Sequence, residues 1–414
     1  MPSSRRLPVA ALALVLLAVP ASAVGDAGPV GGPWTGAWTA AVQRPTSKFY
    51  PTWSEKGFDG HSVRQVVRVT ATGPELRIRL SHAYGSTPLR LTGATVARAG
   101  DGAALVPGTV RHVTFGGARS VTVPAGGKVV SDPVPMAVRI QRRVAVTLYF
   151  EGPTGPVTFH QYALGDSYRA SGDHRADEDP GAYTERTPPW YVLEGVEVAA
   201  RPGPRGVVTF GDSLTDGFGA TPGADDRYPD RLADRLAASG DPRPVLNLGI
   251  GGNRVLSDSA CYGEKAVDRF ARDVLGQPRA GTVIVLEGTN DILMGTTQET
   301  RCTRPNRRVT AAELIEGYRI LIRTAHGAGL RIVGATIPPF PSPPFVVGTY
   351  DPERVRDEVN HWIRTSGEYD AVADFDRAVA DGDHLRPEYD SGDGLHPNAA
   401  GYRAMAEAVD LDSL

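Results

Sequence analysis

A serine, an aspartate and a histidine occur in contexts typical of nucleophilic catalysis. Ser213 directly follows the apolar run 207–210, and residues 211–212 allow a sharp turn that exposes its hydroxyl at a strand end. Asp393 and His396 lie three residues apart near the end of the sequence. Because a serine hydroxyl is a poor nucleophile near neutral pH, it needs a base and a group that orients the base. His396 and Asp393 are the candidates for these two tasks.

Two further segments offer hydrogen-bond donors for the negative charge that develops on an attacked carbonyl oxygen. Segment 247–253 is rich in glycine, and its backbone N–H groups, including that of Gly252, are sterically open. Segment 288–291 carries the side-chain amide of Asn290. Preorganised donors of this kind are worth about 2.7–4 kcal/mol each. Taken alone, each segment is also consistent with an ordinary turn.

The elements that must position these residues alternate between strands and helices beyond residue 205. Apolar runs predict strands at 206–210, 245–248, 282–286, 331–337 and 371–374. Helical periods place Tyr228, Leu232 and Leu236 on one face, and Val267, Phe270 and Val274 on another. A third helix begins at Thr310, with Glu313 at capping-box spacing. This alternation predicts a parallel sheet covered on both faces, with ligands bound beyond the carboxyl ends of its strands.

The preceding part of the sequence has a different pattern. Short runs such as 64–70, 75–81 and 144–150 alternate in polarity and are separated by Gly, Pro and Asp turns. Several short strands at such spacing predict an antiparallel β-sandwich over residues 34–200. The Pro/Gly-rich segment 201–205 is the expected linker to the second domain, 205–414.

Four sequence blocks together resemble the SGNH (GDSL) hydrolases. Ser213 lies in Gly-Asp-Ser-Leu, Gly252 in Asn-x-Gly-x-x-Gly, Asn290 in Gly-Thr-Asn-Asp, and Asp393 and His396 in Asp-Gly-Leu-His-Pro, in the family's order. The resemblance covers about 205–414 and implies a flavodoxin-like three-layer α/β/α domain. It also implies Ser213 as nucleophile, His396 as base and Asp393 as its orienting group, with an oxyanion hole formed by Ser213, Gly252 and Asn290. Residues 34–200 resemble, more loosely, the β domain of some secreted bacterial members.

Other chemistries lack their signatures. The sequence contains no Gly-x-Ser-x-Gly elbow, no His-Glu-x-x-His pair and no P-loop. The aspartates of 374–390 fit a solvated loop better than a calcium site. We therefore expect neither a metal nor a cofactor. Without the two arginines of the leader, 42 basic side chains stand against 47 acidic ones, and this balance gives no indication of nucleic-acid binding.

The first 23 residues have the organisation of a signal peptide. Arg5 and Arg6 precede the apolar run 7–20, and small residues end at Ala23, the expected cleavage site. That run is too short to span a bilayer. We expect a secreted, monomeric protein with no stable membrane anchor.

The only two cysteines and a basic loop lie between the catalytic blocks. An even cysteine count in an exported chain favours a disulfide between Cys261 and Cys302, with two free thiols as the alternative. Arg254 and Arg304 are candidates for selecting an anionic ester, although a solvated charge run is the favoured interpretation of segment 301–308.

These observations predict a secreted serine esterase that acts on a short-chain acyl ester or an acetylated carbohydrate. A lipase or phospholipase type of acylhydrolase uses the same residues and stays open. A second alternative is a glycan-binding protein with an accessory hydrolase domain. In that case Trp34, Trp38, Tyr50 and Trp53 would form a stacking platform, whereas packing in a core is their more common use.

Overall fold

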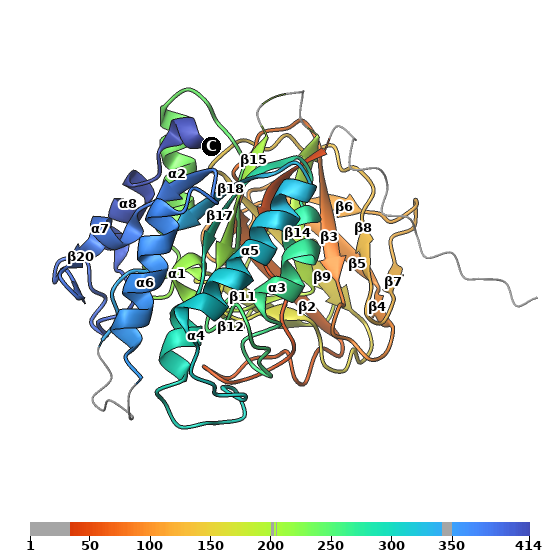
Figure 1. Cartoon of the computed structure of the whole chain (residues 1–414). Coiled ribbons are helices and arrows are strands. Elements are labelled where there is room, and N and C mark those ends of the chain that lie inside the picture. Colours follow the sequence, from red (N-terminus) through yellow and green to blue (C-terminus); the bar gives the residue numbers. More distant parts are fainter. Residues whose placement is uncertain (1–33, 200–202, 204, 342–349) are drawn as a thin grey trace, which may run out of the picture.

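The computed structural model describes residues 34–199, 203, 205–341 and 350–414 (Figure 1). The expected signal peptide, 1–23, and most of the expected linker, 201–205, lie outside the described residues. The predicted domain boundary near residue 200 therefore stays a prediction. Among the described residues, no helix is both long and apolar enough to cross a bilayer.

Residues 34–199, here called the β region, form two main antiparallel sheets. The first has the strand order β1 (Trp34–Thr39), β14 (Leu193–Ala199), β3 (Leu76–Ser81), β8 (Lys128–Val130). The second has the order β12 (Glu185–Thr187), β11 (Ser167–Ser171), β2 (His61–Arg68), β9 (Arg143–Phe150), β5 (Gly93–Arg98), β6 (Arg111–Val113). Two short pairs are β4 (Leu89–Leu91) with β7 (Val121–Val123), and β10 (Phe159–His160) with β13 (Trp190–Tyr191).

The two sheets of the β region share one hydrophobic core. Ile78 of β3 and Val196 of β14 are fully buried in the same cluster as Val63 of β2 and Val146 of β9. Side chains of two antiparallel sheets that interdigitate in this way define a β-sandwich. The predicted antiparallel sheets are thus confirmed, although the sequence pattern did not predict strands such as β5, β11 and β14.

One face of β3 departs from the simple alternation of buried and exposed residues. Leu76, Ile78 and Leu80 are buried in the core as expected, but Arg79 on the opposite face is only 5% exposed. Its guanidinium donates to Glu197 on β14 at 2.8 Å and to Gln277 at 2.9 Å. The polar face of this sheet is therefore covered by the second half of the chain rather than by water.

Residues 205–414, here called the α/β region, are built on a parallel five-stranded sheet. Its strand order is β16 (Val245–Gly249), β15 (Gly206–Gly211), β17 (Ala280–Leu286), β18 (Arg331–Ala335), β19 (Ala371–Ala373). Numbered within this region, the order is 2-1-3-4-5, the flavodoxin-like arrangement. The five predicted strands are present, with ends that differ by up to two residues.

Helices cover both faces of this sheet and complete the three predicted layers (Figure 1). On one face lie α3 (Ala266–Phe270), which continues into the π-helical turn η1 (Ala271–Leu275), α5 (Ala311–Gly327) and α6 (Pro352–Thr365). On the other lie α2 (Tyr228–Ala238), α7 (Phe375–Val379) and α8 (Ala399–Glu407). The predicted capping box begins α5, since Thr310 and Glu313 bond each other's backbone N–H groups. A short hairpin of β20 (Ala380–Asp381) and β21 (His384–Leu385) precedes α8, and the 3-10 turn η2 (Leu411–Ser413) follows it.

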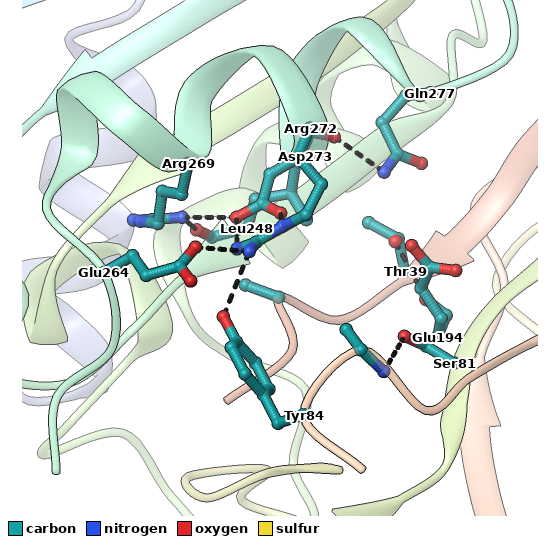
Figure 2. A network of polar contacts seen from close by, with 12 residues as sticks. Thr39, Ser81, Tyr84, Glu194, Leu248, Glu264, Arg269, Arg272, Asp273 and Gln277 are labelled. Carbon is teal, nitrogen blue, oxygen red and sulfur yellow. Dashed lines mark hydrogen bonds and ion pairs between the residues drawn. The ribbon is translucent and has the colours of Figure 1, made fainter. Parts of the chain in front are cut away.

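The β region packs against the edge strand of the parallel sheet. Thr70 Oγ1 donates to the Val245 carbonyl at 3.0 Å and accepts from the Val245 N–H at 3.1 Å. A Cβ atom at Gly36 of β1 would lie 2.7 Å from a Leu246 methyl group, so this close approach requires glycine. Figure 2 shows a polar part of the same junction, where Arg272 of η1 donates to the Tyr84 hydroxyl at 3.0 Å. The unpaired edge of β16 is thereby covered.

Candidate active site

Ser213 is the first residue of the short helix α1 (Ser213–Asp216), immediately after β15. The carboxylate of Asp212 caps this turn by accepting the N–H of Leu214 at 3.0 Å. At Gly211 a Cβ atom would lie 2.3 Å from the Leu286 carbonyl oxygen, so only glycine fits between the strands. The local sequence therefore specifies the turn that presents the Ser213 hydroxyl at the carboxyl edge of the sheet.

Ser213, His396 and Asp393 form a continuous hydrogen-bonded chain. Ser213 Oγ lies 2.9 Å from His396 Nε2, and His396 Nδ1 lies 2.6 Å from Asp393 Oδ2. The backbone N–H of His396 also donates to Asp393 Oδ1 at 2.8 Å. Because a carboxylate only accepts, Nδ1 carries the proton and Nε2 is left to accept the proton of Ser213. This arrangement suits a nucleophile with its base.

The charge state of Asp393 supports this tautomer. Partial burial raises the pKa of Asp393, but the hydrogen bonds from His396 lower it more, with help from the N–H of Leu395. The net result is a pKa well below the ordinary value for aspartate. Asp393 therefore stays ionised at neutral pH and stabilises the imidazolium that forms when His396 takes up a proton.

Gly252 lies in the loop that follows β16, with φ of +78°. A Cβ atom there would lie 2.6 Å from the ring of Tyr262, so both the conformation and the space require glycine. The loop is tied to the serine turn, because Gly251 N–H donates to Asp216 Oδ2 at 2.9 Å and Ile250 N–H donates to the Gly211 carbonyl at 2.9 Å. The Gly252 segment is thus held beside α1.

Asn290 lies in the first turn of α4 (Thr289–Met294), which follows β17. Its Nδ2 atom donates to Asp212 Oδ2 at 3.3 Å. A primary amide has two N–H bonds, so this contact orients the group and leaves the second N–H for another acceptor. The next residue, Asp291, accepts the N–H groups of Val255 and Leu256 at 2.7 and 3.0 Å. The structure therefore holds the segments of Gly252 and Asn290 beside the serine turn, while the catalytic roles of the three predicted oxyanion-hole residues stay predictions.

Arg269 of α3 joins the loops that carry these residues. Its fully buried guanidinium donates to the carbonyls of Gly211 and Leu248 at 2.9 and 3.0 Å, and to Asn253 Oδ1 at 2.8 Å. It also pairs with Asp273 at 3.1 Å and with Glu287 at 3.2 Å. Figure 2 shows it with Leu248 and Asp273. The sequence offers only a weak signal here: Arg269 and Asp273 lie four residues apart on the predicted helix, a spacing that is equally typical of an exposed ion pair.

A histidine of the β region reaches the same turn. His160 of β10 lies with Nε2 3.0 Å from Asp216 Oδ1 and with Nδ1 2.8 Å from the Ala41 carbonyl. Because both partners only accept, both ring nitrogens carry protons and the imidazole is positively charged. Burial lowers the pKa of His160, but Asp216 raises it more, so the pKa ends above its ordinary value. No local signal marks this pair, because its members are 56 residues apart in sequence.

The structure contains the predicted disulfide between Cys261 and Cys302. It joins the loop after β16 to the loop after α4 and lies in a small cluster with Tyr262, the residue that covers Gly252. The bridge therefore fastens the loop that carries Gly252 to the loop that follows the helix of Asn290.

Replacing both cysteines with alanine is expected to lower the free energy of unfolding by about 4 kcal/mol, because the bridge closes a loop of about 42 residues in the unfolded chain. Urea denaturation of the two proteins measures this difference. Reductant should destabilise the wild type and leave the double variant unchanged. Equal stability of the two proteins without reductant would contradict the prediction.

The expectation that Arg254 faces the substrate is not met. Arg254 is only 3% exposed, and its guanidinium donates to the carbonyls of Thr303, Pro305 and Asp258 at 2.9, 2.7 and 2.6 Å. It therefore holds the disulfide-bonded loop in place. Arg304 is exposed and pairs with Glu299 at 2.8 Å within its own loop, so its proposed part in substrate selection stays a prediction.

The aromatic residues considered as a glycan platform do not form one surface. Trp38 is buried, and Trp53 packs against the core of the β region. The guanidinium of Arg77 covers the ring of Trp34 at 4.5 Å, and the hydroxyl of Tyr50 donates to a main-chain carbonyl. Packing is thus the main use of this set.

Three of the aspartates between residues 374 and 390 pair with arginines, namely Asp374, Asp376 and Asp383. Asp374 and Asp376 both accept from Arg364, at 2.7 and 2.6 Å. The part of the chain that the structure describes contains no group of three or more His, Cys, Asp or Glu side chains arranged to hold a metal ion.

A flavodoxin-like α/β/α sheet with a Ser-His-Asp chain at its carboxyl edge defines a hydrolase of the SGNH class. Comparison with family profiles bears this out, since residues 209–404 match the GDSL-like lipase/acylhydrolase family. Residues 209–404 therefore form a GDSL-like lipase/acylhydrolase domain. No curated protein matches the chain.

Solved structures with a similar fold align with about half of the chain. An aryl esterase of M. smegmatis is 19% identical, with a TM-score of 0.38, over 49% of this chain and 95% of its own. The carbohydrate acetylesterase Est24 of Sinorhizobium meliloti gives the same four values. An acetyl xylan esterase is 17% identical, with a TM-score of 0.38, over 49% of this chain and 96% of its own.

Proposed function

We propose that the protein is a carboxylic ester hydrolase that forms an acyl-enzyme on Ser213. The observation that carries the proposal is the hydrogen-bonded order Ser213, His396, Asp393, at 2.9 and 2.6 Å, at the carboxyl edge of the sheet. The family assignment supports an acylhydrolase of this kind. The proposed substrates are short-chain acyl esters or acetylated carbohydrates.

In the first half of the reaction, Ser213 Oγ attacks the carbonyl carbon while its proton passes to His396 Nε2. The oxyanion accepts hydrogen bonds from the backbone N–H groups of Ser213 and Gly252 and from the amide of Asn290. The bond from carbon to the alcohol oxygen then breaks, and His396 returns the proton to that oxygen. The alcohol leaves, and the acyl group stays esterified to Ser213.

In the second half, water replaces the alcohol. His396 Nε2 takes a proton from the water as its oxygen attacks the acyl carbon, and the same three donors hold the new oxyanion. The bond to Ser213 Oγ breaks, and His396 returns the proton to that oxygen. Asp393 keeps the imidazole in one orientation throughout, so that a single base serves both halves.

We also propose that the protein acts outside the cytoplasm. The signal-peptide pattern of residues 1–23 supports export. The disulfide between Cys261 and Cys302 supports it independently, because such bonds persist mainly in oxidising compartments.

Covalent labelling tests the proposed nucleophile. A fluorophosphonate is expected to modify the native protein once, at Ser213, because only a serine activated by a base attacks phosphorus at a useful rate. Peptide mass spectrometry after proteolysis locates the adduct.

The matched controls are two histidine variants. His396→Ala should prevent labelling, whereas His326→Ala should not, although His326 also pairs with an aspartate, Asp370, at 3.0 Å. Labelling of a different serine in the folded protein would refute the assignment of Ser213.

A further inference from the structure

A groove lies where the β region meets the α/β region, beside the candidate active site. Its volume is about 770 Å³, within the range of pockets that bind small molecules. The β region contributes most of its lining, and the α/β region contributes the loop that follows α1. The residues used below are Phe49, Tyr50, Tyr162, Leu164, Gly165 and Phe218, and we call this site the junction groove.

One end of the junction groove touches the catalytic base. The ring of Phe218 lies 4.4 Å from the ring of His396, measured between centroids. On its other side, Phe218 stacks on Tyr162 of the β region at 4.7 Å, with 19° between the ring planes. Phe218 is fixed in this position, because its N–H donates to the Ser213 carbonyl at 2.9 Å and its carbonyl accepts from Tyr402 at 2.6 Å.

Phe49 extends the junction groove toward the oxyanion loop. Its ring lies 5.6 Å from the ring of Tyr262, the residue that covers Gly252. A Cβ atom at Gly251 would lie 3.9 Å from the Phe49 ring. Phe49 is 40% exposed, so its ring is accessible to a ligand. The aromatic wall therefore runs from the base to the oxyanion side of Ser213.

The polar groups of the junction groove are already paired or neutral. The Tyr50 hydroxyl donates to the Gln161 carbonyl. Asp166 and Arg186, which also line it, pair with each other at 3.3 Å. Burial raises the pKa of Tyr162 to about 12, so its hydroxyl is uncharged at neutral pH. Among these residues, no unpaired charge is therefore available to bind an ionic substrate. The surface that is available is apolar and aromatic.

We infer that the junction groove binds an apolar part of the substrate, an aromatic ring or an acyl chain attached to the scissile ester, so that the β region sets the ester specificity. This inference rests on the proposed esterase function, because the groove is placed relative to Ser213 and His396. It favours apolar esters over acetylated sugars. An acyl chain and an aryl alcohol share the required chemistry, and the experiment distinguishes them.

Two variants change the junction groove in opposite ways. Gly165→Leu adds a side chain where a Cβ atom meets only the Ala163 carbonyl oxygen, at 4.0 Å, so the groove is filled without a clash. Phe49→Ala removes an exposed ring from its wall. Gly152→Leu is the matched control, because a Cβ atom there meets nothing within 4 Å and Gly152 does not line the groove.

The measured quantity is the ratio of kcat/KM for a large ester to that for methyl acetate. Methyl hexanoate tests the acyl side, and 2-naphthyl acetate tests the alcohol side. Gly165→Leu and Phe49→Ala should each lower about tenfold the ratio for methyl hexanoate if the groove binds the acyl chain, or the ratio for 2-naphthyl acetate if it binds the alcohol. This is the effect of losing one or two buried methylene groups. Gly152→Leu should change neither ratio. Intrinsic differences in ester reactivity cancel, since each ratio is compared between variant and wild type.

Failure of this inference differs from failure of the proposed function. If wild type hydrolyses these esters but both groove variants keep both ratios, the junction groove is not a substrate site. If the folded wild type hydrolyses none of the three esters, the esterase proposal fails, and calorimetric titration with 2-naphthol then decides on the groove. Weaker binding of 2-naphthol to Gly165→Leu than to Gly152→Leu would support it, and equal binding would overturn it.

Discussion

Replacing Ser213 with alanine is expected to lower kcat for ester hydrolysis by about 10⁶-fold, the loss seen when a triad serine is removed. The reason is that Ser213 Oγ is the atom that attacks the ester and accepts the acyl group. In the variant, His396 has no hydroxyl at that position to activate. The donors of the oxyanion hole remain in place, so a residual rate about 10³–10⁴ times that of water should persist. Steady-state hydrolysis of an aryl ester, with a melting curve for each protein, measures the change.

Ser239→Ala is the control for this experiment. Ser239 follows α2, and its hydroxyl donates to the Leu236 carbonyl at 3.0 Å, outside the site. This variant should keep wild-type kcat. Activity of folded Ser213→Ala within tenfold of wild type would mean that another residue performs the attack.

Arg269→Met is expected to lower the free energy of unfolding by about 3–5 kcal/mol, because removal of one member of a buried ion network leaves its partners unpaired. Asp273 and Glu287 lose their cationic partner, and the carbonyls of Gly211 and Leu248 lose their donors. Since these carbonyls end β15 and β16, kcat for ester hydrolysis should also fall. Urea denaturation and steady-state kinetics measure the two effects.

The stability loss in Arg269→Met should grow with pH. Burial already raises the pKa of Glu287 well above its ordinary value, and Arg269 opposes that rise. Without Arg269 the folded protein holds the Glu287 proton more tightly still. A raised carboxyl pKa makes stability greatest below the unfolded pKa, about 4.3, and lower as pH rises above it. The deficit relative to wild type should therefore grow as the pH rises past the Glu287 pKa of the folded wild type, which a series of denaturation curves across pH measures.

Two further variants serve as comparisons for the stability loss in Arg269→Met. Arg269→Lys keeps the charge but not the planar fork of donors, so its stability should lie between wild type and Arg269→Met. Arg354→Met removes an exposed arginine paired with Glu358 at 2.8 Å, and its cost should be below about 1 kcal/mol. If Arg269→Met were as stable as Arg354→Met, the guanidinium would not be the link between the loops.

Residues of the β region contact the candidate active site directly. His160 contacts the last residue of the serine helix, and Phe49 and Tyr162 line the groove beside the base. The β region is therefore in direct contact with the site, whereas its strand pattern indicates only a neighbouring sandwich. Figure 1 shows the strands of this region beside the parallel sheet.

The sequence alone determined the parallel sheet, its alternating helices and the five residues of the candidate site. These features are encoded locally. Glycine is required at 211 by the close approach of a neighbouring strand and at 252 by a positive φ, and apolar runs with turn residues mark each strand end. Since parallel strands present their carboxyl ends at one edge, residues that follow different strands are brought together by the topology itself.

Only the tertiary structure decided which charged and aromatic side chains support that site. Arg254 and Arg269 both lie near catalytic blocks in the sequence, yet one holds a disulfide-bonded loop and the other joins three strand ends. His160 and Phe49 are far from Ser213 along the chain and carry no motif. Their roles follow from packing between distant elements, which fixes burial and hydrogen-bond partners and has no periodic trace in the sequence.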